Sequence, residues 1–396
     1  MSPMTLAAWI LVALPLVLGA YAYAGYPLFL AAAARVRGRR PAAARPEEWP
    51  TVSICLPAYN EEAQIRGAVE SLLRLDYPAD RRQILVVSDA STDRTDDIVR
   101  EYADRGVELL RMPQRGGKTA GENAAARHLT GEIVVNTDAS IRIRPDALKP
   151  LLARFADPTV GVASGRDLSV GKAGDDANAG EGGYVGYEMS VRAMETAVDG
   201  IIGASGCFYA IRAELHRTQL PQHLSRDFAS ALVAREHGYR AVSVDEAVCF
   251  VPRTSSLRRE YRRKVRTIAR GMETLWHKRR LMNPLRHGVF AWMLLSHKVA
   301  RWLLPWTIVG GAAGVALLAA DHVWARVVLA AGVGVGALAL AGWLWPEDRP
   351  IPRVLAMPAF AVTGNLAAMH AFLRALSEED GATWEPTRRD VVLSGS

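Results

Sequence analysis

The chain has 396 residues, half of them apolar, and a formal net charge of +7 at pH 7. This composition excludes a disordered or collagen-like polymer. Apolar residues are unevenly distributed, because no charged residue occurs from Met1 to Ala34 and three more stretches of membrane-spanning length lie near the C-terminus: Leu303 to Ala320, Val327 to Pro346 and Val354 to Leu373. A purely soluble protein is therefore not expected.

Residues 1–35 are predicted to form an N-terminal transmembrane anchor. A helical span needs about 20 apolar residues, and this stretch exceeds that length although Pro15 and Pro27 should kink it. A cleaved signal peptide would carry basic residues before its apolar run, and Met1 to Thr5 has none. The arginines between Arg35 and Arg45 follow the anchor, which indicates that residues 36–50 are a basic cytoplasmic linker. We expect a multi-pass protein of the plasma (inner) membrane, with its central segment in the cytoplasm.

The three cysteines, Cys55, Cys207 and Cys249, are far apart and form no CxxC pair. This spacing supports neither a disulfide framework nor a Cys-type zinc site. We expect three small buried side chains in a reducing compartment.

The segment from Val52 to about Val251 alternates predicted strands and helices, which is typical of an α/β fold with a mainly parallel sheet. Asn60 is expected to cap a helix that begins at Glu61 and Glu62. The Gly/Ala/Asp-rich run from Gly165 to Gly183 is expected to be a mobile loop. The other predicted strands are Val52–Leu56, Ile84–Ser88, Val107–Arg111 and Ile133–Asn136, and the other helices lie near Arg94–Ala103 and Thr119–Leu129.

Two carboxylates are predicted to meet at one edge of this sheet. Asp89 follows the strand Ile84–Ser88 and Asp138 follows Ile133–Asn136, and ligands of such sheets bind beyond the C-terminal ends of the strands. Capping the next helix is the favoured role of Asp93. Gly117-Lys118-Thr119 imitates a phosphate-binding P-loop, but the first glycine of that motif is missing, because position 112 is Met. An ATPase or GTPase is therefore not favoured.

Five segments resemble, in order, the motifs of family 2 glycosyltransferases with a GT-A fold. They are Thr51 to Glu62 (TVSICLPAYNEE), Val87 to Asp93 (VSDASTD), Asn136 to Ser140 (NTDAS), Gly203 to Arg212 (GASGCFYAIR) and Arg226 to Phe228 (RDF). The flanking apolar helices are similar to those of the membrane-embedded branch that includes cellulose, chitin, hyaluronan and poly-N-acetylglucosamine synthases. The resemblance implies a GT-A domain over residues 51–285, interfacial and transmembrane helices over 286–376, and a tail over 377–396.

The resemblance implies inverting, metal-dependent transfer of a hexose from a nucleotide diphosphate sugar, most often UDP-linked, to a lipid or glycan acceptor. Asp138 would hold Mg²⁺ or Mn²⁺, which neutralises the leaving diphosphate. The second Asp of the family's Asp-x-Asp motif is replaced here by Ser140. The residues that would surround the nucleotide are Pro57, Tyr59, Glu61, Glu62, Asp89, Lys118 and Asp138. A solvated residue at a helix start is the alternative for Lys118.

Asp227 matches the family's general base, which takes the proton of the acceptor hydroxyl. The alternative is a structural role, in which Asp227 is the N-cap of the helix that it begins. Gly203 and Gly206 suit a close backbone approach beside the acceptor. Processive relatives carry a Gln-x-x-Arg-Trp motif that contacts diphosphate and acceptor. Here Arg263 and Arg266 occupy the corresponding stretch, but the Gln and the Trp are absent.

The basic run from Arg253 to Arg280 precedes an apolar segment, so anionic membrane lipids and a nucleotide diphosphate are nearer partners than nucleic acid. A processive polysaccharide synthase is the alternative within the enzyme class, although so few spans would need a homo-oligomer to build a channel. A non-catalytic sensor of nucleotide sugars is the alternative from another class. The stretch 354–373 either crosses the membrane or lies at its interface, because it contains Asn365 and His370, and Arg388 and Arg389 of the tail favour the cytoplasm.

Overall fold

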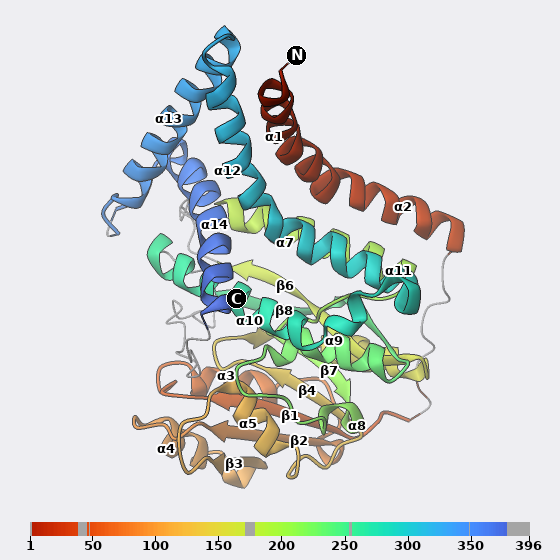
Figure 1. The fold of residues 1–396 in the computed structure, drawn as a ribbon. Coiled ribbons are helices and arrows are strands. Elements are labelled where there is room, and N and C mark those ends of the chain that lie inside the picture. The colour runs from red at the N-terminus through yellow and green to blue at the C-terminus, as the bar shows by residue number, and fades with distance from the viewer. Residues whose placement is uncertain are drawn as a thin grey trace.

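The computed structural model describes residues 2–38, 46, 48–170, 179–252, 256–347 and 349–377. An eight-stranded sheet lies at one end of the molecule, and long apolar helices extend from it toward the other end (Figure 1). The strand order is β3-β2-β1-β4-β7-β6-β8-β5. Much of the basic linker, the first residues of the basic run at Arg253, and nearly all of the C-terminal tail lie outside the described residues.

The first half of the sheet is parallel. β1 pairs with β2 and with β4, and β2 pairs with β3, all in the parallel sense. Connecting helices return the chain between these strands, as the predicted alternation requires. The elements of this half are β1 (Val52–Ala58), α3 (Ile65–Leu73), η2 (Ala79–Arg81), β2 (Arg82–Ser88), α4 (Thr95–Arg100), η3 (Ala103–Arg105), β3 (Val107–Arg111), α5 (Lys118–Ala125) and β4 (Ile133–Thr137).

The second half of the sheet is mixed. β7 is antiparallel to both β4 and β6, and β8 is parallel to β6 but antiparallel to β5. The GT-A architecture is confirmed, with a mixed extension of the parallel strands. The elements here are β5 (Arg142–Ile143), α6 (Leu148–Ala153), η4 (Arg154–Ala156), β6 (Val160–Val170), α7 (Ala179–Val198), β7 (Phe208–Arg212), α8 (Ala213–His216), α9 (Arg226–Glu236), β8 (Arg240–Pro252), α10 (Leu257–His277) and η6 (Arg279–Met282).

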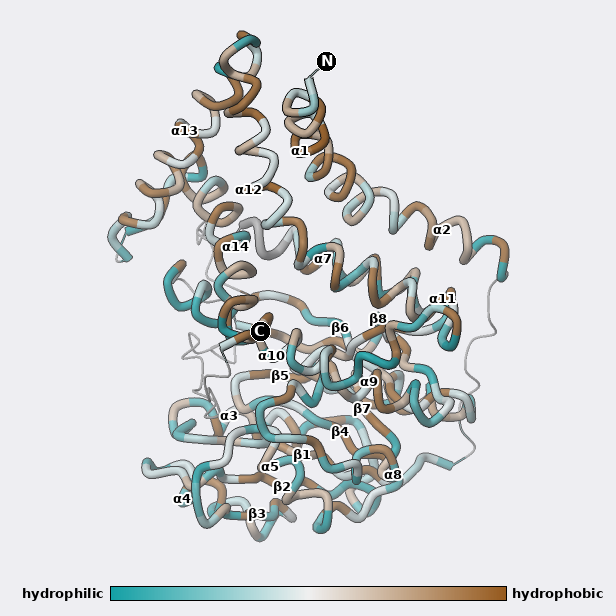
Figure 2. Tube along the Cα trace, viewed as in Figure 1, coloured by the Kyte–Doolittle hydropathy of each residue, from teal (hydrophilic) through white to brown (hydrophobic). Residues whose placement is uncertain are grey.

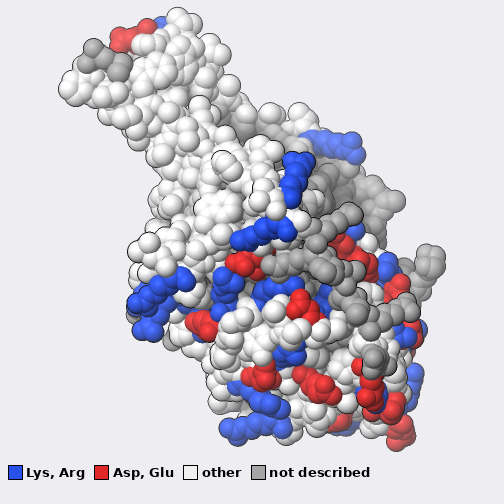
Figure 3. Space-filling model, turned by 90° about the vertical axis from the view of Figure 1, so that its right-hand side faces the viewer, with Lys and Arg blue, Asp and Glu red and all other residues white. Residues whose placement is uncertain are grey.

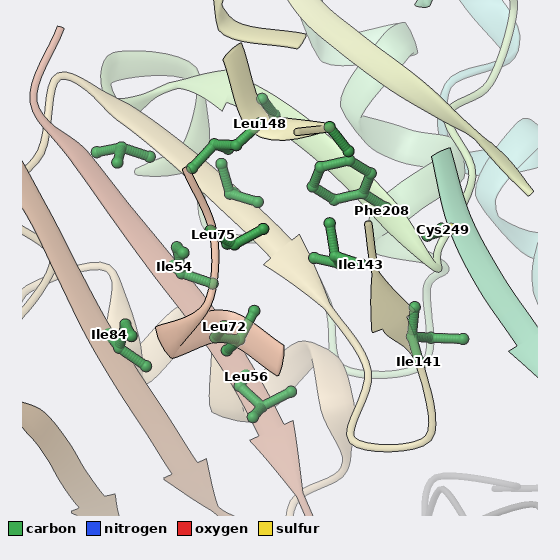
Figure 4. Packing of buried hydrophobic residues seen from close by; sticks show 14 of the residues in the cluster. Ile54, Leu56, Leu72, Leu75, Ile84, Ile141, Ile143, Leu148, Phe208 and Cys249 are labelled. Carbon is green, nitrogen blue, oxygen red and sulfur yellow. The ribbon is translucent and has the colours of Figure 1, made fainter. Parts of the chain in front are cut away.

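Helices cover both faces of this sheet. On one face Ile54, Ile84 and Phe208 pack with Leu72 of α3 and Leu148 of α6 (Figure 4). On the other face the strands pack against α5 and α9. All the strand residues of β1 are buried, which explains its continuous apolar run. Cys55 and Cys249 lie buried in these two cores as free thiols, as the sequence predicted, whereas Cys207 is only partly buried.

The helix predicted to start at Glu61 begins at Ile65 instead. Asn60 has a positive φ of 51° and does not cap that helix. The backbone N–H of Glu61 donates to Thr95 Oγ1 at 2.8 Å, and that of Glu62 donates to Asp93 Oδ2 at 3.0 Å. These donors therefore bind the loop after β2, and the turn at 61–64 precedes the helix.

The mobile loop predicted from Gly165 to Gly183 was wrong at both of its ends. Residues 165–170 extend β6, and α7 begins at Ala179. Gly165 lies within this strand, and a Cβ at this position would come within 2.6 Å of the Phe208 ring. This glycine therefore reflects close packing in the sheet and does not indicate a loop. The middle of the run lies outside the described residues.

Four helical segments are long and apolar enough to cross a membrane. The first runs without a gap through α1 (Pro3–Ala20), η1 (Tyr21–Gly25) and α2 (Tyr26–Arg37). The others comprise α11 (Pro284–Leu294), η7 (Leu295–Val299) and α12 (Ala300–Leu318), then α13 (Val323–Trp343), then α14 (Arg353–Leu376). Figure 2 shows these segments as the most hydrophobic part of the chain, and in Figure 3 the same end is almost free of charged side chains.

The last helix, α14, ends beside α10 (Figure 1). Its Ala367 and Ala371 pack on Val265 and Ala269 of α10. The Lys264 ammonium lies 3.7 Å from the centroid of the Phe360 ring. The start of α1, in contrast, lies at the far end of the apolar helices (Figure 1).

Candidate active site

The centre of the site is an ion pair between α5 and the loop after β4. The Lys118 ammonium donates to Asp138 Oδ1 at 2.5 Å and to the backbone carbonyl of Gly206 at 3.2 Å. Burial acts against the ammonium, but the carboxylates of Asp138, Glu122 and Asp227 outweigh it and raise the pKa of Lys118. Lys118 is therefore a charged residue held inside the cleft, and the solvated alternative for it is wrong.

Asp227 lies at the start of α9, against the loop before β7. A Cβ placed on Gly206 would come within 2.6 Å of Asp227 Oδ2, so only glycine fits at this position. The Ser225 hydroxyl donates to Asp227 Oδ1. Likewise, a Cβ placed on Gly203 would lie 2.8 Å from the Phe228 ring. Both glycines thus permit a close approach to α9.

The structure places Asp89 under the loop that leads into α5. Its two carboxylate oxygens accept hydrogen bonds from the backbone N–H groups of Gly116 and Gly117, at 2.7 and 2.8 Å. Asp89 is 3% exposed. It therefore orients the loop that presents Lys118. Asp93 accepts from the backbone N–H and the hydroxyl of Thr95 at the start of α4, although the N-cap of this helix is Arg94 and not Asp93 as predicted.

The remaining residues predicted at the nucleotide lie around the ends of β1 and β2. Pro57 is buried inside β1, opposite Val87 of β2. Tyr59 is partly exposed, and the Arg115 guanidinium stacks on its ring at 3.9 Å from the centroid. Glu62 accepts from the backbone N–H of Arg94. Glu61, one residue before it, is partly buried in the same turn.

Sequence reasoning missed a buried ion pair beneath these residues. Glu122, one turn after Lys118 on α5, is 0% exposed, and Arg226 on α9 is 3% exposed. Arg226 Nε lies 3.7 Å from Glu122 Oε2. Arg226 also donates to the carbonyls of His216 and Thr218. Burial raises the pKa of Glu122 to about 7, although Lys118 and Arg226 act in the opposite direction.

The arginines of α10 differ from one another in their surroundings. The Arg263 guanidinium makes two bonds to Glu260 on its own helix, at 2.8 and 2.7 Å. Arg266 is partly buried on the same helix. Arg270, one turn after Arg266, has a buried Nη2 without a hydrogen-bond partner in the described part of the chain. Burial lowers the pKa of Arg270, while Asp227 acts in the opposite direction, so the two groups share one environment.

Within the described residues, no group of three or more His, Cys, Asp or Glu side chains is placed to hold a metal ion. Asp138 is the one carboxylate that follows β4 at the cleft, and its side chain is 24% exposed. Mg²⁺ and Mn²⁺ prefer oxygen ligands, and Mg²⁺ is commonly bound by one or two carboxylates together with substrate phosphates and water. The site therefore fits a metal that arrives with a nucleotide diphosphate.

Comparisons with known proteins agree with this geometry. Residues 53–218 match the model of the family "Glycosyl transferase family 2". The chain carries a family 2 glycosyltransferase domain. This confirms the enzyme class predicted from the motifs. The matched range includes Lys118, Asp138 and Gly206, and it ends before Asp227.

Curated relatives of the domain are glycosyltransferases. The chain is 30% identical over 171 residues to a beta-monoglucosyldiacylglycerol synthase from Synechocystis, covering 42% of this chain and 36% of that protein. It is 34% identical over 125 residues to an N-acetylglucosaminyltransferase from Mesorhizobium japonicum, covering 30% of this chain and 29% of that protein. The chain therefore matches only about a third of the length of these relatives.

One solved structure resembles nearly the whole chain. The mannosyltransferase PcManGT from Pyrobaculum calidifontis, solved in complex with GDP-Man and Mn²⁺, has a TM-score of 0.70 and 26% sequence identity. The similarity covers 93% of this chain and 100% of that structure. The helices that flank the family 2 domain are thus shared with this relative.

Proposed function

We propose that this protein transfers a hexose from a nucleoside diphosphate sugar to a hydroxyl group of a lipid or glycan acceptor, with inversion, at the cytoplasmic face of the inner membrane. One observation carries the proposal: Lys118 binds both Asp138 and the Gly206 carbonyl, and Gly206 lies directly against Asp227. A cation, a carboxylate suited to a metal and a second carboxylate thus line a single cleft.

The chemical roles follow from these positions. Asp227 takes the proton of the acceptor hydroxyl as that oxygen attacks the anomeric carbon, and the bond from this carbon to the diphosphate breaks. Lys118 and Arg270 stabilise the negative charge that develops on the leaving diphosphate. Asp138, with the diphosphate itself, would hold the divalent metal, which supplies further neutralisation of that charge. Tyr59 and the turn at 61–64 line the nucleoside end.

The apolar helices support an acceptor that is presented at the membrane. Phe228 belongs to a hydrophobic cluster that also contains Tyr26 and Leu30 of α2 and Phe290 and Met293 of α11. The residue next to the proposed base therefore packs directly with the membrane-associated helices. A lipid or lipid-linked glycan held in the bilayer would approach Asp227 from this side.

The test is a panel of UDP- and GDP-linked hexoses incubated with the purified full-length protein, Mn²⁺ or Mg²⁺, and a total lipid extract. Release of nucleoside diphosphate and transfer of labelled sugar are both measured. We expect one donor to be consumed with lipid-dependent incorporation, and products of a single added hexose. Long polymers would favour the processive synthase. Donor binding without any turnover would favour the non-catalytic sensor.

A further inference from the structure

The Lys298 side chain lies in an unusual environment near the proposed base. It belongs to η7, where the chain passes from α11 into α12, and its ammonium lies 5.4 Å from the centroid of the Phe228 ring. Among the described residues, its ammonium takes part in no hydrogen bond or ion pair. A partly buried ammonium is costly unless an anion accompanies it.

The acidic side chains nearest to Lys298 already have other partners. His297 Nδ1 lies 2.6 Å from Glu195 Oε1, and its Nε2 lies 2.9 Å from Glu188 Oε1. Arg301 donates to Glu188 at 2.8 Å, and the Tyr26 hydroxyl donates to Glu195 at 2.6 Å. Because both ring nitrogens of His297 face carboxylates, the ring satisfies both only as a charged imidazolium. The two acids are therefore neutralised without Lys298.

A second cation increases the positive charge at this place. Arg192 of α7 is 7% exposed, and its charge acts on Lys298. Its guanidinium donates to the Ser164 hydroxyl, but its buried Nε has no hydrogen-bond partner among the described residues. Because His297 and Arg301 already neutralise Glu188 and Glu195, Lys298 and Arg192 are two additional positive charges at this place.

The position of Lys298 relative to Asp227 indicates what this charge binds. Phe228 directly follows Asp227, and its ring is enclosed by the Gly203 backbone and the Lys298 ammonium. Trp302, one turn after Lys298, packs on Gly271, where a Cβ would lie 3.3 Å from the indole. Gly271 in turn follows Arg270. Lys298 thus lies against the residue that directly follows the proposed base, on the side of the membrane helices.

We propose that Lys298 binds a phosphate group of the acceptor, and that the acceptor is an anionic lipid whose headgroup carries a free hydroxyl close to that phosphate. The ammonium would hold the phosphate at the membrane side of Phe228 while the hydroxyl reaches Asp227. This inference rests on the proposed function, because it assigns the substrate class of the same site. It makes Lys298 a residue that discriminates anionic from neutral lipid acceptors.

The test measures binding without any sugar donor. Dioleoylphosphatidylglycerol, dioleoylglycerol and glycerol phosphate are titrated into the full-length protein in a neutral detergent. We expect Lys298→Met to weaken binding of dioleoylphosphatidylglycerol about 10- to 100-fold, the usual effect of losing a charge-assisted hydrogen bond. Lys298→Arg should restore it. Lys278→Met is the matched control, because Lys278 is bound to Glu236 at 2.7 Å, at the opposite end of α9 from Phe228.

Equal losses in the two methionine variants would overturn the proposal, since the anionic lipid would then bind to general surface charge. Binding of glycerol phosphate as tight as that of the lipid would also overturn it, because the site would then recognise a free phosphate. In a second measurement, lipid extract is separated by ion exchange and used as acceptor with labelled donor. Incorporation into the anionic fraction supports the proposal, and incorporation only into the neutral fraction overturns it. Absence of all transfer would refute the proposed function, while the donor-free binding result would still decide the role of Lys298.

Discussion

Lys118 and Asp138 form a 2.5 Å ion pair across the cleft, between the start of α5 and the loop after β4. The ammonium thus contacts the carboxylate that is the best oxygen ligand for a metal in this cleft. The two roles are compatible, because a diphosphate offers Lys118 alternative oxygens when a metal binds Asp138. The pair holds the carboxylate in place before donor and metal arrive.

Replacement of Asp138 by Asn should remove the dependence of nucleotide affinity on the metal. An amide cannot supply the negative charge, and Ser140 replaces the second carboxylate of the motif. The measurement is calorimetric titration of UDP and GDP with and without Mn²⁺. We expect the affinity of the variant with Mn²⁺ to equal its metal-free affinity. Asp97→Asn, at an exposed ion pair on α4, is the control. A metal-dependent gain that persists in Asp138→Asn would place the metal elsewhere.

Replacement of Arg270 by Met should weaken nucleoside diphosphate binding about 10- to 100-fold, because a charged hydrogen bond to phosphate is lost. The same substitution at Arg263 should have little effect, since that guanidinium is bound to Glu260 on its own helix. Titration of the nucleotide in the presence of Mn²⁺ compares the two variants. If Arg263→Met causes the larger loss of nucleotide affinity, Arg263 and not Arg270 binds the diphosphate, as the resemblance to the processive motif implies.

Glu122 should make folding stability depend on pH. Its pKa is raised by burial from an ordinary value of 4.5 to about 7. Between these pH values the folded protein retains a proton that the unfolded chain has lost, so the free energy of unfolding falls as pH rises through this window. Above about pH 7 both states are ionised and this contribution becomes constant.

Thermal unfolding of the detergent-solubilised protein from pH 5 to pH 8 measures this effect. We expect the decrease in Tm over this range to be smaller in Glu122→Gln than in the original protein. Glu101→Gln, which changes an exposed partner of Arg66, should leave the decrease unchanged. An identical pH profile for Glu122→Gln and the original protein would show that Glu122 is ionised throughout this range.

The strands of the parallel half could be predicted from sequence because each is a short buried run with a polar turn after it. Lys118, Asp138 and Asp227 could be predicted because each belongs to a motif. Glu122 and Arg270 could not, although each follows a predicted site residue by one helical turn and so shares its face. The position of Glu122 in the site depends on α9, because Arg226 of that helix lies 3.7 Å from Glu122 although the two residues are far apart in the sequence.

The same limit explains the errors in the fold. Asn60 has the right residue type for a helix cap, but its amide donates to Thr92 Oγ1 in the loop after β2. Gly165 favours a loop in isolation, and only its close approach to the Phe208 ring explains why a glycine occurs at this position of a strand. Local patterns therefore located the motifs, while contacts between distant segments determined the local backbone.

The arrangement of α14 suggests which parts face the cytoplasm. If the family 2 domain is cytoplasmic, the end of α14 beside α10 is cytoplasmic too, and the turn between α12 and α13 is external. Single cysteines at Ser377 and Asp321, in a background with Cys207→Ser, can be labelled from outside intact cells with an impermeant maleimide. We expect Asp321→Cys to react and Ser377→Cys to react only after the cells are opened. The reverse pattern would invert the proposed orientation, and reaction of both would show that α14 crosses the membrane.

Asp227→Asn tests the proposed chemistry most directly. The amide keeps the size of the side chain and still accepts a hydrogen bond from Ser225, so α9 and the contact with Gly206 should be preserved. A general base typically contributes about 10²- to 10⁴-fold to the rate. We therefore expect turnover to fall by about this factor while the donor affinity stays within a few-fold.

Two measurements separate the base from a purely structural role of Asp227. Thermal unfolding should be nearly unchanged in the Asn variant, because the N-cap of α9 is Ser225 and not Asp227, contrary to the structural alternative, and the amide oxygen can still accept from Ser225. Release of nucleotide and transfer of sugar should decrease together, because without a base the acceptor hydroxyl no longer attacks efficiently. Substantial unfolding would assign Asp227 to the structure of α9, since the contact with Gly206 leaves no room for a displaced side chain. Transfer at a near-normal rate would place the base on another residue of the cleft.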